Sequence, residues 1–126
     1  MTHTFDLRVY YEDVDLGGIV YYANYLRFIE RARTEWIREM GIAQGALKDE
    51  AGVVFVVRRL EADYLSPARY DDQLQVRTAL VEHRRTSLTL TQEVWRGETR
   101  MFSALVVLVS MSLEGRPVRL PAGLRL

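Results

Sequence analysis

The chain has 126 residues, of which 48% are hydrophobic and 27% charged, and these values are ordinary for one soluble globular domain. We therefore expect residues 1–126 to form a single domain. The 17 basic and 17 acidic side chains cancel, so no overall field favours nucleic acid or an acidic membrane surface. Cysteine is absent, which excludes disulfides, thiolate metal ligands and a thiol nucleophile.

The sequence shows no targeting or membrane-spanning pattern. Charged residues are scattered through the first 20 positions, which is unlike a secretory signal peptide. The most apolar run, residues 101–111, is about half as long as the ~20 residues that a spanning helix needs. We expect a cytoplasmic protein with no integral membrane segment and no nucleic-acid partner.

The first predicted element is a strand over residues 3–12, where apolar side chains alternate with polar ones: Phe5, Leu7, Val9 and Tyr11. A long helix is predicted next, because apolar residues recur every three or four positions at Leu26, Ile29, Ala32, Trp36 and Met40. Asn24 is placed to cap its first turn, and Gly41 to follow its last residue. The exposed face of this helix is expected to carry ion pairs between Glu30 and Arg33, Glu35 and Arg38, and Arg31 and Glu35.

After a short irregular or helical segment at 43–50, the remaining chain predicts strands. Residues 53–64, 73–83, 87–96 and 100–113 are rich in β-branched and apolar side chains, with turn residues between them. One long helix followed by long strands predicts an α+β fold, with an antiparallel sheet wrapped around one central helix. A single helix cannot cover all of such a sheet, so we expect a homodimer or homotetramer joined at sheet edges.

The stretch between the first strand and the long helix carries the candidate chemistry. Asp13 and Asp15 stand just before Gly17 and Gly18, and Asn24 follows where the helix begins. This order places a carboxylate beside backbone N–H groups at a helix N-terminus, where an oxyanion can be held. The plainer interpretation is that both aspartates are solvated turn residues and that the glycines only permit the turn.

The same stretch resembles a known family. The segment D-x-D-x-G-G-I-V-Y at residues 13–21, N-Y at 24–25 and E-R-A-R-T-E at 30–35 are similar to the hotdog-fold acyl-CoA thioesterases. Within these, the chain resembles the 4-hydroxybenzoyl-CoA thioesterase family and especially its Tol-Pal-associated, YbgC-type branch. Matches at 55–58, 67–69 and 86–88 extend the resemblance over nearly the whole chain. One departure is Tyr22, where that branch commonly has histidine and the hydroxybenzoyl-type enzymes have tyrosine.

The resemblance implies the hotdog fold and hydrolysis of an acyl-CoA thioester to a carboxylic acid and free coenzyme A. Asp15 matches the catalytic aspartate, acting as general base or nucleophile. Gly17 and Gly18 would let the backbone approach the substrate, and the amides around Tyr21, Tyr22 and Ala23 would form the oxyanion hole. The Tyr22 side chain would wall the acyl pocket or take part in catalysis. No metal or redox cofactor is implied.

Two further sets of residues are candidates. Arg58, Arg84, Arg85, Thr86 and Ser87 could bind the coenzyme A phosphates, since guanidinium groups and hydroxyls stand together near a strand junction; the cluster could equally be solvated. Glu30 is a rival catalytic carboxylate, because another class of hotdog thioesterases uses one on the central helix. The presence of Glu30 can also be explained fully by ion pairing on the helix surface.

Two other functions remain open from the sequence. A hotdog hydratase or dehydratase would need a histidine converging with a carboxylate, and no histidine lies between residues 4 and 82. A non-catalytic acyl-CoA-binding protein would keep the fold without turnover. The intact motif from Asp15 to Asn24 argues against this second alternative.

Overall fold

The computed structural model of the chain describes residues 2–126. In chain order the elements are β1 (Thr2–Arg8), the 3₁₀ turn η1 (Tyr11–Asp13), α1 (Asn24–Glu39), α2 (Gln44–Ala51), β2 (Val53–Tyr64), β3 (Gln73–His83), β4 (Ser87–Arg96) and β5 (Thr99–Ser112). The strands form one sheet of five in the order β1-β3-β4-β5-β2, and every neighbouring pair is antiparallel.

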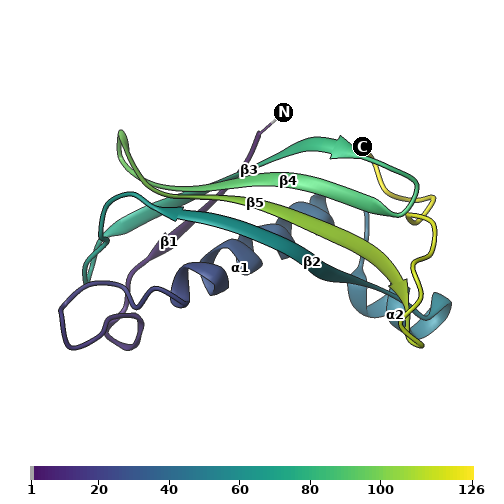
Figure 1. Cartoon of the computed structure of the whole chain (residues 1–126), viewed down its shortest axis with the longest axis horizontal. Helices are drawn as coiled ribbons and strands as arrows, with labels where there is room; N and C mark the ends of the chain where they lie inside the picture. Colours follow the sequence, from purple (N-terminus) through teal and green to yellow (C-terminus); the bar gives the residue numbers. More distant parts are fainter. Residues whose placement is uncertain (1) are drawn as a thin grey trace.

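The sheet curves over α1, which lies against its concave face (Figure 1). The loop that precedes α1 lies at one end of the molecule, and α2 lies with the C-terminal segment at the other end. This arrangement confirms the predicted α+β fold with one central helix.

Apolar side chains from α1 and from the inner face of the sheet form the core. Phe28, Ile29 and Ala32 are at most 1% exposed, and they pack with Val76 and Leu90 of the central strands, which are fully buried. Their spacing follows the helical period on α1 and the two-residue period on the strands. Fully burying one side chain of this size contributes about 1.5–3 kcal/mol, so these contacts hold the helix to the sheet.

The four strands after the helix begin and end within one residue of their predicted limits, and α2 confirms the helical alternative for the preceding segment. The first strand is shorter than predicted. β1 ends at Arg8, and Tyr11 is 83% exposed instead of facing the core. A local hydrogen bond causes this difference, because the Asp13 carboxylate accepts the Tyr10 N–H at 2.8 Å and bends the chain into η1.

The start of α1 also differs from the prediction. Ala23 is the N-cap and Asn24 is the first helical residue, so the expected capping role of Asn24 was wrong. The Asn24 side chain donates instead of accepting: its Nδ2 lies 2.9 Å from the Asp13 carbonyl oxygen. At the other end, Gly41 follows the C-cap Met40 with φ of +97°, which confirms the predicted helix stop.

A buried polar contact fixes α1 to the sheet. Gln92 of β4 is fully buried, and its Nε2 donates to the Ile29 carbonyl and to the Thr78 hydroxyl, each at 2.9 Å. Its Oε1 accepts a hydrogen bond from Arg33 at 2.9 Å. Burial lowers the pKa of Arg33 from its ordinary value, and the nearby Glu30 opposes that effect.

Of the ion pairs expected on α1, one forms among the described residues. Arg38 pairs with Glu35. Arg33 turns inward to Gln92, and Glu30 accepts a hydrogen bond from the Thr34 hydroxyl at 2.8 Å.

Candidate active site

The site is built on the loop between β1 and α1, which folds back on itself at Asp15. The Asp15 N–H donates to the Ile19 carbonyl at 3.0 Å, and the Gly18 N–H donates to the Asp15 carbonyl at 3.0 Å. Gly18 takes φ of +77°, a conformation that a residue with a Cβ adopts only at a cost. This tight turn leaves the Asp15 side chain exposed, and its Oδ1 accepts the Gly17 N–H at 2.8 Å.

Asp13 joins this loop to the start of α1. It is 8% exposed, and its backbone carbonyl accepts hydrogen bonds from the Tyr21 N–H and from Asn24 Nδ2, each at 2.9 Å. The Tyr21 N–H is therefore used within the fold. Its expected place in the oxyanion hole was wrong.

Two backbone donors just before α1 remain open. Within residues 2–126, the N–H groups of Tyr22 and Ala23 have no hydrogen-bond acceptor. Their peptide units are fixed from the carbonyl side, since the Tyr21 carbonyl accepts the Asn24 N–H at 2.8 Å and the Tyr22 carbonyl accepts the Tyr64 hydroxyl at 2.9 Å. Free N–H groups at a helix N-terminus favour bound negative charge.

Asp15 and this helix start line one pocket of about 430 Å³. The other lining residues come from the segment before α1, from its first turn and from the end of β2: Ile19, Val20, Tyr21, Tyr22, Tyr25, Tyr64, Leu65, Ser66 and Pro67. The wall is largely aromatic. Tyr22 lies edge-on to Tyr64 with ring centroids 6.2 Å apart, and Tyr64 packs against Phe102 at 5.0 Å. The pocket can therefore hold an apolar group beside the Asp15 carboxylate and the backbone of Tyr22.

Tyr25 and Tyr64 are pocket residues that the sequence analysis did not single out. The Tyr25 hydroxyl accepts the Ala68 N–H at 3.1 Å, which holds the loop after β2 in place. Burial raises the pKa of Tyr64 above its ordinary value, with smaller contributions from Tyr22 and Tyr25, so its hydroxyl keeps its proton as a donor. The helical period could have placed Tyr25 on the core face, whereas nothing in the sequence pattern brings Tyr64 to the helix start.

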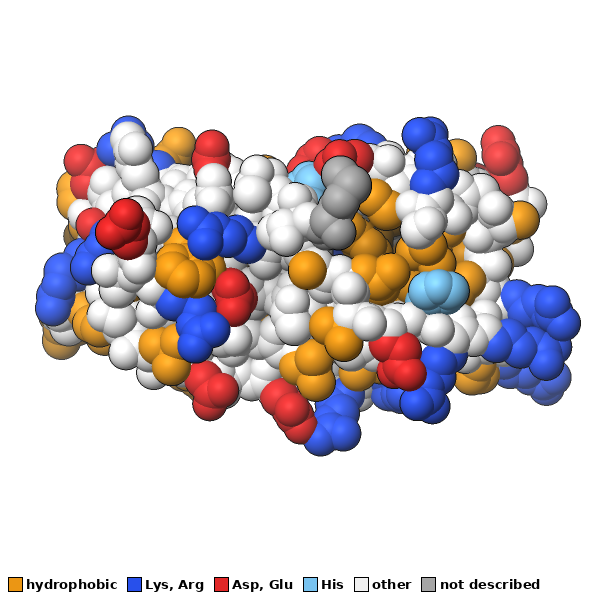
Figure 2. All heavy atoms as spheres, turned by 90° about the horizontal axis from the view of Figure 1, so that it is seen from above, with side chains coloured by type: hydrophobic (Ala, Val, Ile, Leu, Met, Phe, Trp, Pro, Cys, Tyr) orange, Lys and Arg blue, Asp and Glu red, His pale blue; other side chains and the backbone are white. Residues whose placement is uncertain are grey.

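The predicted phosphate-binding residues lie far from Asp15 within one chain. Arg84, Arg85 and Thr86 form the turn between β3 and β4, and Ser87 begins β4, at the opposite end of the sheet from the Asp15 loop (Figure 1). The 11 residues of β3 separate these ends by roughly 35 Å at the usual strand rise. Figure 2 shows basic side chains gathered at the end where this turn and the C-terminal segment lie.

Arg58 is exposed on β2, where a bulge shifts the pairing with β5. Arg84 and Arg85 are exposed as well, whereas Ser87 is only 8% exposed. A single chain thus brings together Asp15, Gly17, Gly18 and Tyr22, and it leaves the arginines apart from them.

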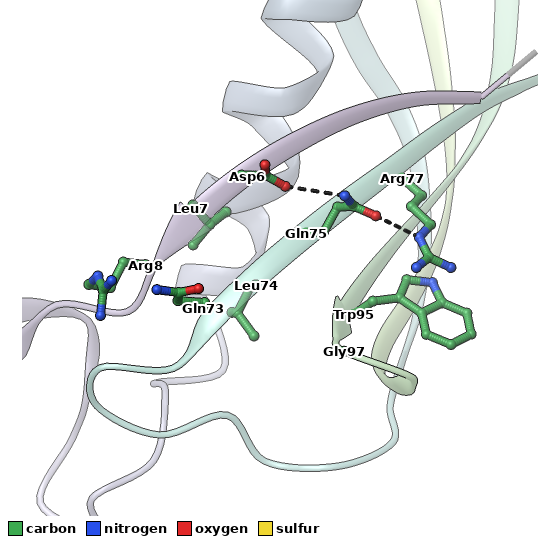
Figure 3. Close-up of a pocket in the computed structure, with 9 residues that line it drawn as sticks. All are labelled: Asp6, Leu7, Arg8, Gln73, Leu74, Gln75, Arg77, Trp95 and Gly97. Carbon is green, nitrogen blue, oxygen red and sulfur yellow. Dashed lines mark hydrogen bonds between the residues drawn. The ribbon is translucent and has the colours of Figure 1, made fainter.

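A second pocket, of about 530 Å³, lies on the face of the sheet turned away from α1. Figure 3 shows three of its polar side chains joined by hydrogen bonds: Asp6 accepts from Gln75 at 3.2 Å, and Gln75 accepts from Arg77 at 2.9 Å. The Arg77 guanidinium stacks on Trp95, 4.2 Å from the ring centroid. Asp6, Gln75, Arg77 and Trp95 are thus engaged with one another on this face.

Within residues 2–126 the structure offers neither a metal-ion cluster nor a membrane-spanning helix. No group of three or more His, Cys, Asp or Glu side chains is arranged to hold a metal ion. No helix in this range is long and apolar enough to cross a membrane.

An antiparallel sheet of five strands wrapped around one long central helix is the arrangement of the hotdog fold. Residues 17–103 match the model of the thioesterase superfamily, which is most of the chain. The chain therefore belongs to the thioesterase superfamily, and the predicted family and enzyme class are confirmed.

Individual relatives agree with this assignment. The chain is 44% identical over 117 residues to the acyl-CoA thioester hydrolase YbgC of Escherichia coli, covering 91% of this chain and 87% of that protein. A probable thioesterase from Bartonella henselae superimposes with a TM-score of 0.91 at 34% identity, covering 96% and 100% of the two chains. A mutant 4-hydroxybenzoyl-CoA thioesterase solved with 4-hydroxybenzoyl-CoA gives a TM-score of 0.88 at 26% identity, covering 96% and 94%.

Proposed function

We propose that the protein hydrolyses acyl-CoA thioesters to a carboxylic acid and free coenzyme A, with Asp15 as the catalytic carboxylate. One observation carries this proposal: Asp15 and the N-terminus of α1 line the same aromatic pocket. The names of the relatives from Escherichia coli and Haemophilus influenzae support the acyl-CoA class of substrate.

In the general-base route, Asp15 takes a proton from a water molecule while the water oxygen attacks the thioester carbonyl carbon. The carbonyl electrons move onto the oxygen, which the N–H groups of Tyr22 and Ala23 hold as an oxyanion. When the carbonyl re-forms, the carbon–sulfur bond breaks and coenzyme A leaves as a thiolate, which takes up a proton. The Tyr22 ring walls the acyl pocket in this scheme, and Gly17 and Gly18 let the loop approach the substrate.

In the nucleophilic route, Asp15 attacks the carbonyl carbon itself, coenzyme A leaves, and water opens the resulting anhydride. A single turnover in ¹⁸O-water compares the two routes. Label found on Asp15 shows direct attack, with water opening the anhydride at the aspartyl carbonyl. Label confined to the acid product is the result we expect for the general-base route; it also arises if water opens an anhydride at the acyl carbon.

The functional unit that we propose is a homodimer or a tetramer built from dimers. β2 is an edge strand of 12 residues, and Val57, Leu60 and Tyr64 on it are 38–49% exposed. Pairing two β2 edges about a twofold axis would bury these side chains. It would also bring the Val53 end of one subunit beside the Tyr64 end of the other.

That pairing would bring the predicted phosphate-binding residues of one subunit close to the active site of the other. The turn with Arg84, Arg85 and Thr86, together with Ser87, lies at the Val53 end of the sheet, and the bulge at Arg58 lies near the middle of β2. In the paired assembly these residues of one subunit would face the Asp15 pocket of the other. Exposed guanidinium groups there would bind the coenzyme A phosphates.

A thiol-release assay over acyl-CoA substrates from acetyl to palmitoyl, with benzoyl and 4-hydroxybenzoyl included, tests the function. Release of free thiol by the wild-type protein and its loss in Asp15→Asn is the expected result. A protein that binds acyl-CoA tightly but releases no thiol from any member contradicts it. A hydratase would instead change the absorbance of an enoyl-CoA without releasing thiol.

A further inference from the structure

The end of β2 contacts the start of α1 through one hydrogen bond. The Tyr64 hydroxyl donates to the backbone carbonyl of Tyr22 at 2.9 Å, although the two residues are 42 positions apart in the chain. The Tyr22 carbonyl lies just before the first helical residue, Asn24. The Leu26 N–H, four residues further along, bonds to the Ala23 carbonyl at 3.1 Å instead of to this one, so Tyr64 supplies the donor that Leu26 does not.

The bonded carbonyl belongs to the peptide unit whose N–H is that of Ala23. All peptide bonds in residues 2–126 are trans, so the C=O and N–H of this unit point in opposite directions. Fixing the carbonyl therefore fixes the direction of the Ala23 N–H, one of the two free donors just before α1. A hydrogen bond accepted by the carbonyl also polarises the peptide and strengthens its N–H as a donor.

The Tyr64 ring is held independently of its hydroxyl. It packs against Tyr25 at 5.5 Å and against Phe102 at 5.0 Å between ring centroids, and both of those residues are buried. The position of the hydroxyl is thus set by the sheet and the core. Removing the oxygen alone leaves these ring contacts in place.

We propose that Tyr64 is a positioning residue for the oxyanion hole, whose hydroxyl orients the Tyr22–Ala23 peptide so that the Ala23 N–H points at the developing oxyanion. This inference rests on the proposed thioester hydrolysis and adds to it a residue of the sheet edge. Tyr64 acts through the peptide in this role and does not touch the reacting atoms.

The test compares Tyr64→Phe with wild type in steady-state kinetics on the acyl-CoA that the substrate panel shows to be hydrolysed fastest. Loss of one neutral hydrogen bond that acts mainly in the transition state should lower kcat by about threefold to tenfold. KM should stay within about twofold, because ground-state binding does not depend on the peptide direction. Tyr70→Phe, which removes a hydroxyl from a tyrosine that is 60% exposed and outside the Asp15 pocket, serves as the matched control.

A spectroscopic readout separates this role from a general loss of structure. The ketone analogue of butyryl-CoA, with a methylene group in place of sulfur and ¹³C at the carbonyl, is bound at saturation to each protein. Infrared difference spectra then report its C=O stretch, which falls as the carbonyl is polarised. In Tyr64→Phe the stretch should lie at higher frequency than in wild type, and in Tyr70→Phe it should not move.

An unchanged kcat in Tyr64→Phe overturns the inference. A lower kcat with an unmoved carbonyl stretch overturns it as well, because the hydroxyl would then act elsewhere. These outcomes are distinct from failure of the proposed function, which would appear as absence of thiol release from the wild-type protein on every substrate.

Discussion

The side-chain amide of Asn24 donates a hydrogen bond to the backbone carbonyl of Asp13 at 2.9 Å, and so joins the first residue of α1 to the loop that carries Asp15. The same carbonyl accepts the Tyr21 N–H at 2.9 Å. The carboxylate and the free N–H groups at the helix start therefore hold a fixed separation, which catalysis by a positioned base requires.

The first prediction concerns this link. Asn24→Ala should lower kcat by roughly tenfold, because the loop can then shift relative to the helix start. Stability should fall by about 1 kcal/mol, the usual net value of one hydrogen bond, since the Asp13 carbonyl keeps its bond from Tyr21. Thermal unfolding and steady-state kinetics measure the two effects. A kcat equal to wild type would show that the link does not position the site.

The second prediction concerns Gly17. A Cβ at this residue would lie 3.1 Å from the Asp15 Oδ1, so Gly17→Ala should displace the carboxylate and lower kcat about tenfold. The matched control is Gly45→Ala in α2, where a Cβ meets no atom within 4 Å. That control should keep full activity, and its free energy of unfolding should rise by about 0.5–1 kcal/mol, the usual benefit of alanine over glycine in a helix. Equal activity in both variants would contradict the close approach of Gly17 to Asp15.

The third prediction concerns Tyr22, which is 61% exposed. Its contribution in the proposed mechanism comes from its backbone N–H and from its ring. Tyr22→Phe should therefore retain most of kcat. Loss of a positioned acid or base is worth roughly 10²–10⁴ in rate, so a fall of that size would assign a chemical role to the hydroxyl.

The fourth prediction concerns assembly through β2. The protein should run as a dimer or tetramer in sizing chromatography at micromolar concentration, and not as a monomer of 14.6 kDa. Leu60→Lys, which places a charge on the exposed edge strand, should shift the protein toward monomer and reduce activity together. Leu113→Lys, at a residue 57% exposed outside the sheet, is the control. An active wild-type monomer would contradict the proposed assembly.

Much of the fold follows from the sequence, because the spacing of apolar residues and the residues that form turns both act over short stretches of chain. The strands at 53–64, 73–83 and 87–96 were predicted with the limits that the structure has. The end of the first strand was missed, because the hydrogen bond from the Tyr10 N–H to the Asp13 carboxylate overrides the alternation. Sequence alternation does not reveal which aspartate side chain will accept a hydrogen bond from a neighbouring backbone N–H.

The polar contacts of the site were harder to predict. An asparagine amide can donate or accept a hydrogen bond, so a helix cap and a link to a distant carbonyl look alike in sequence. Asn24 forms the link to the Asp13 carbonyl. Arg33 was expected to pair on the helix surface, yet it binds the buried Gln92. The inward position of Gln92 between Leu90 and Val94 was a signal that could have found this contact.

The most direct test of the account is kcat for thiol release by Asp15→Asn. The change keeps the shape of the side chain and removes the carboxylate charge, so kcat should fall by roughly 10²–10⁴ while acyl-CoA binding is largely kept. The matched control is Glu30→Gln, which changes an exposed carboxylate on α1 and should lower kcat much less. Near-normal activity in Asp15→Asn, or a comparable loss in Glu30→Gln, would contradict the assignment of Asp15 as the catalytic carboxylate.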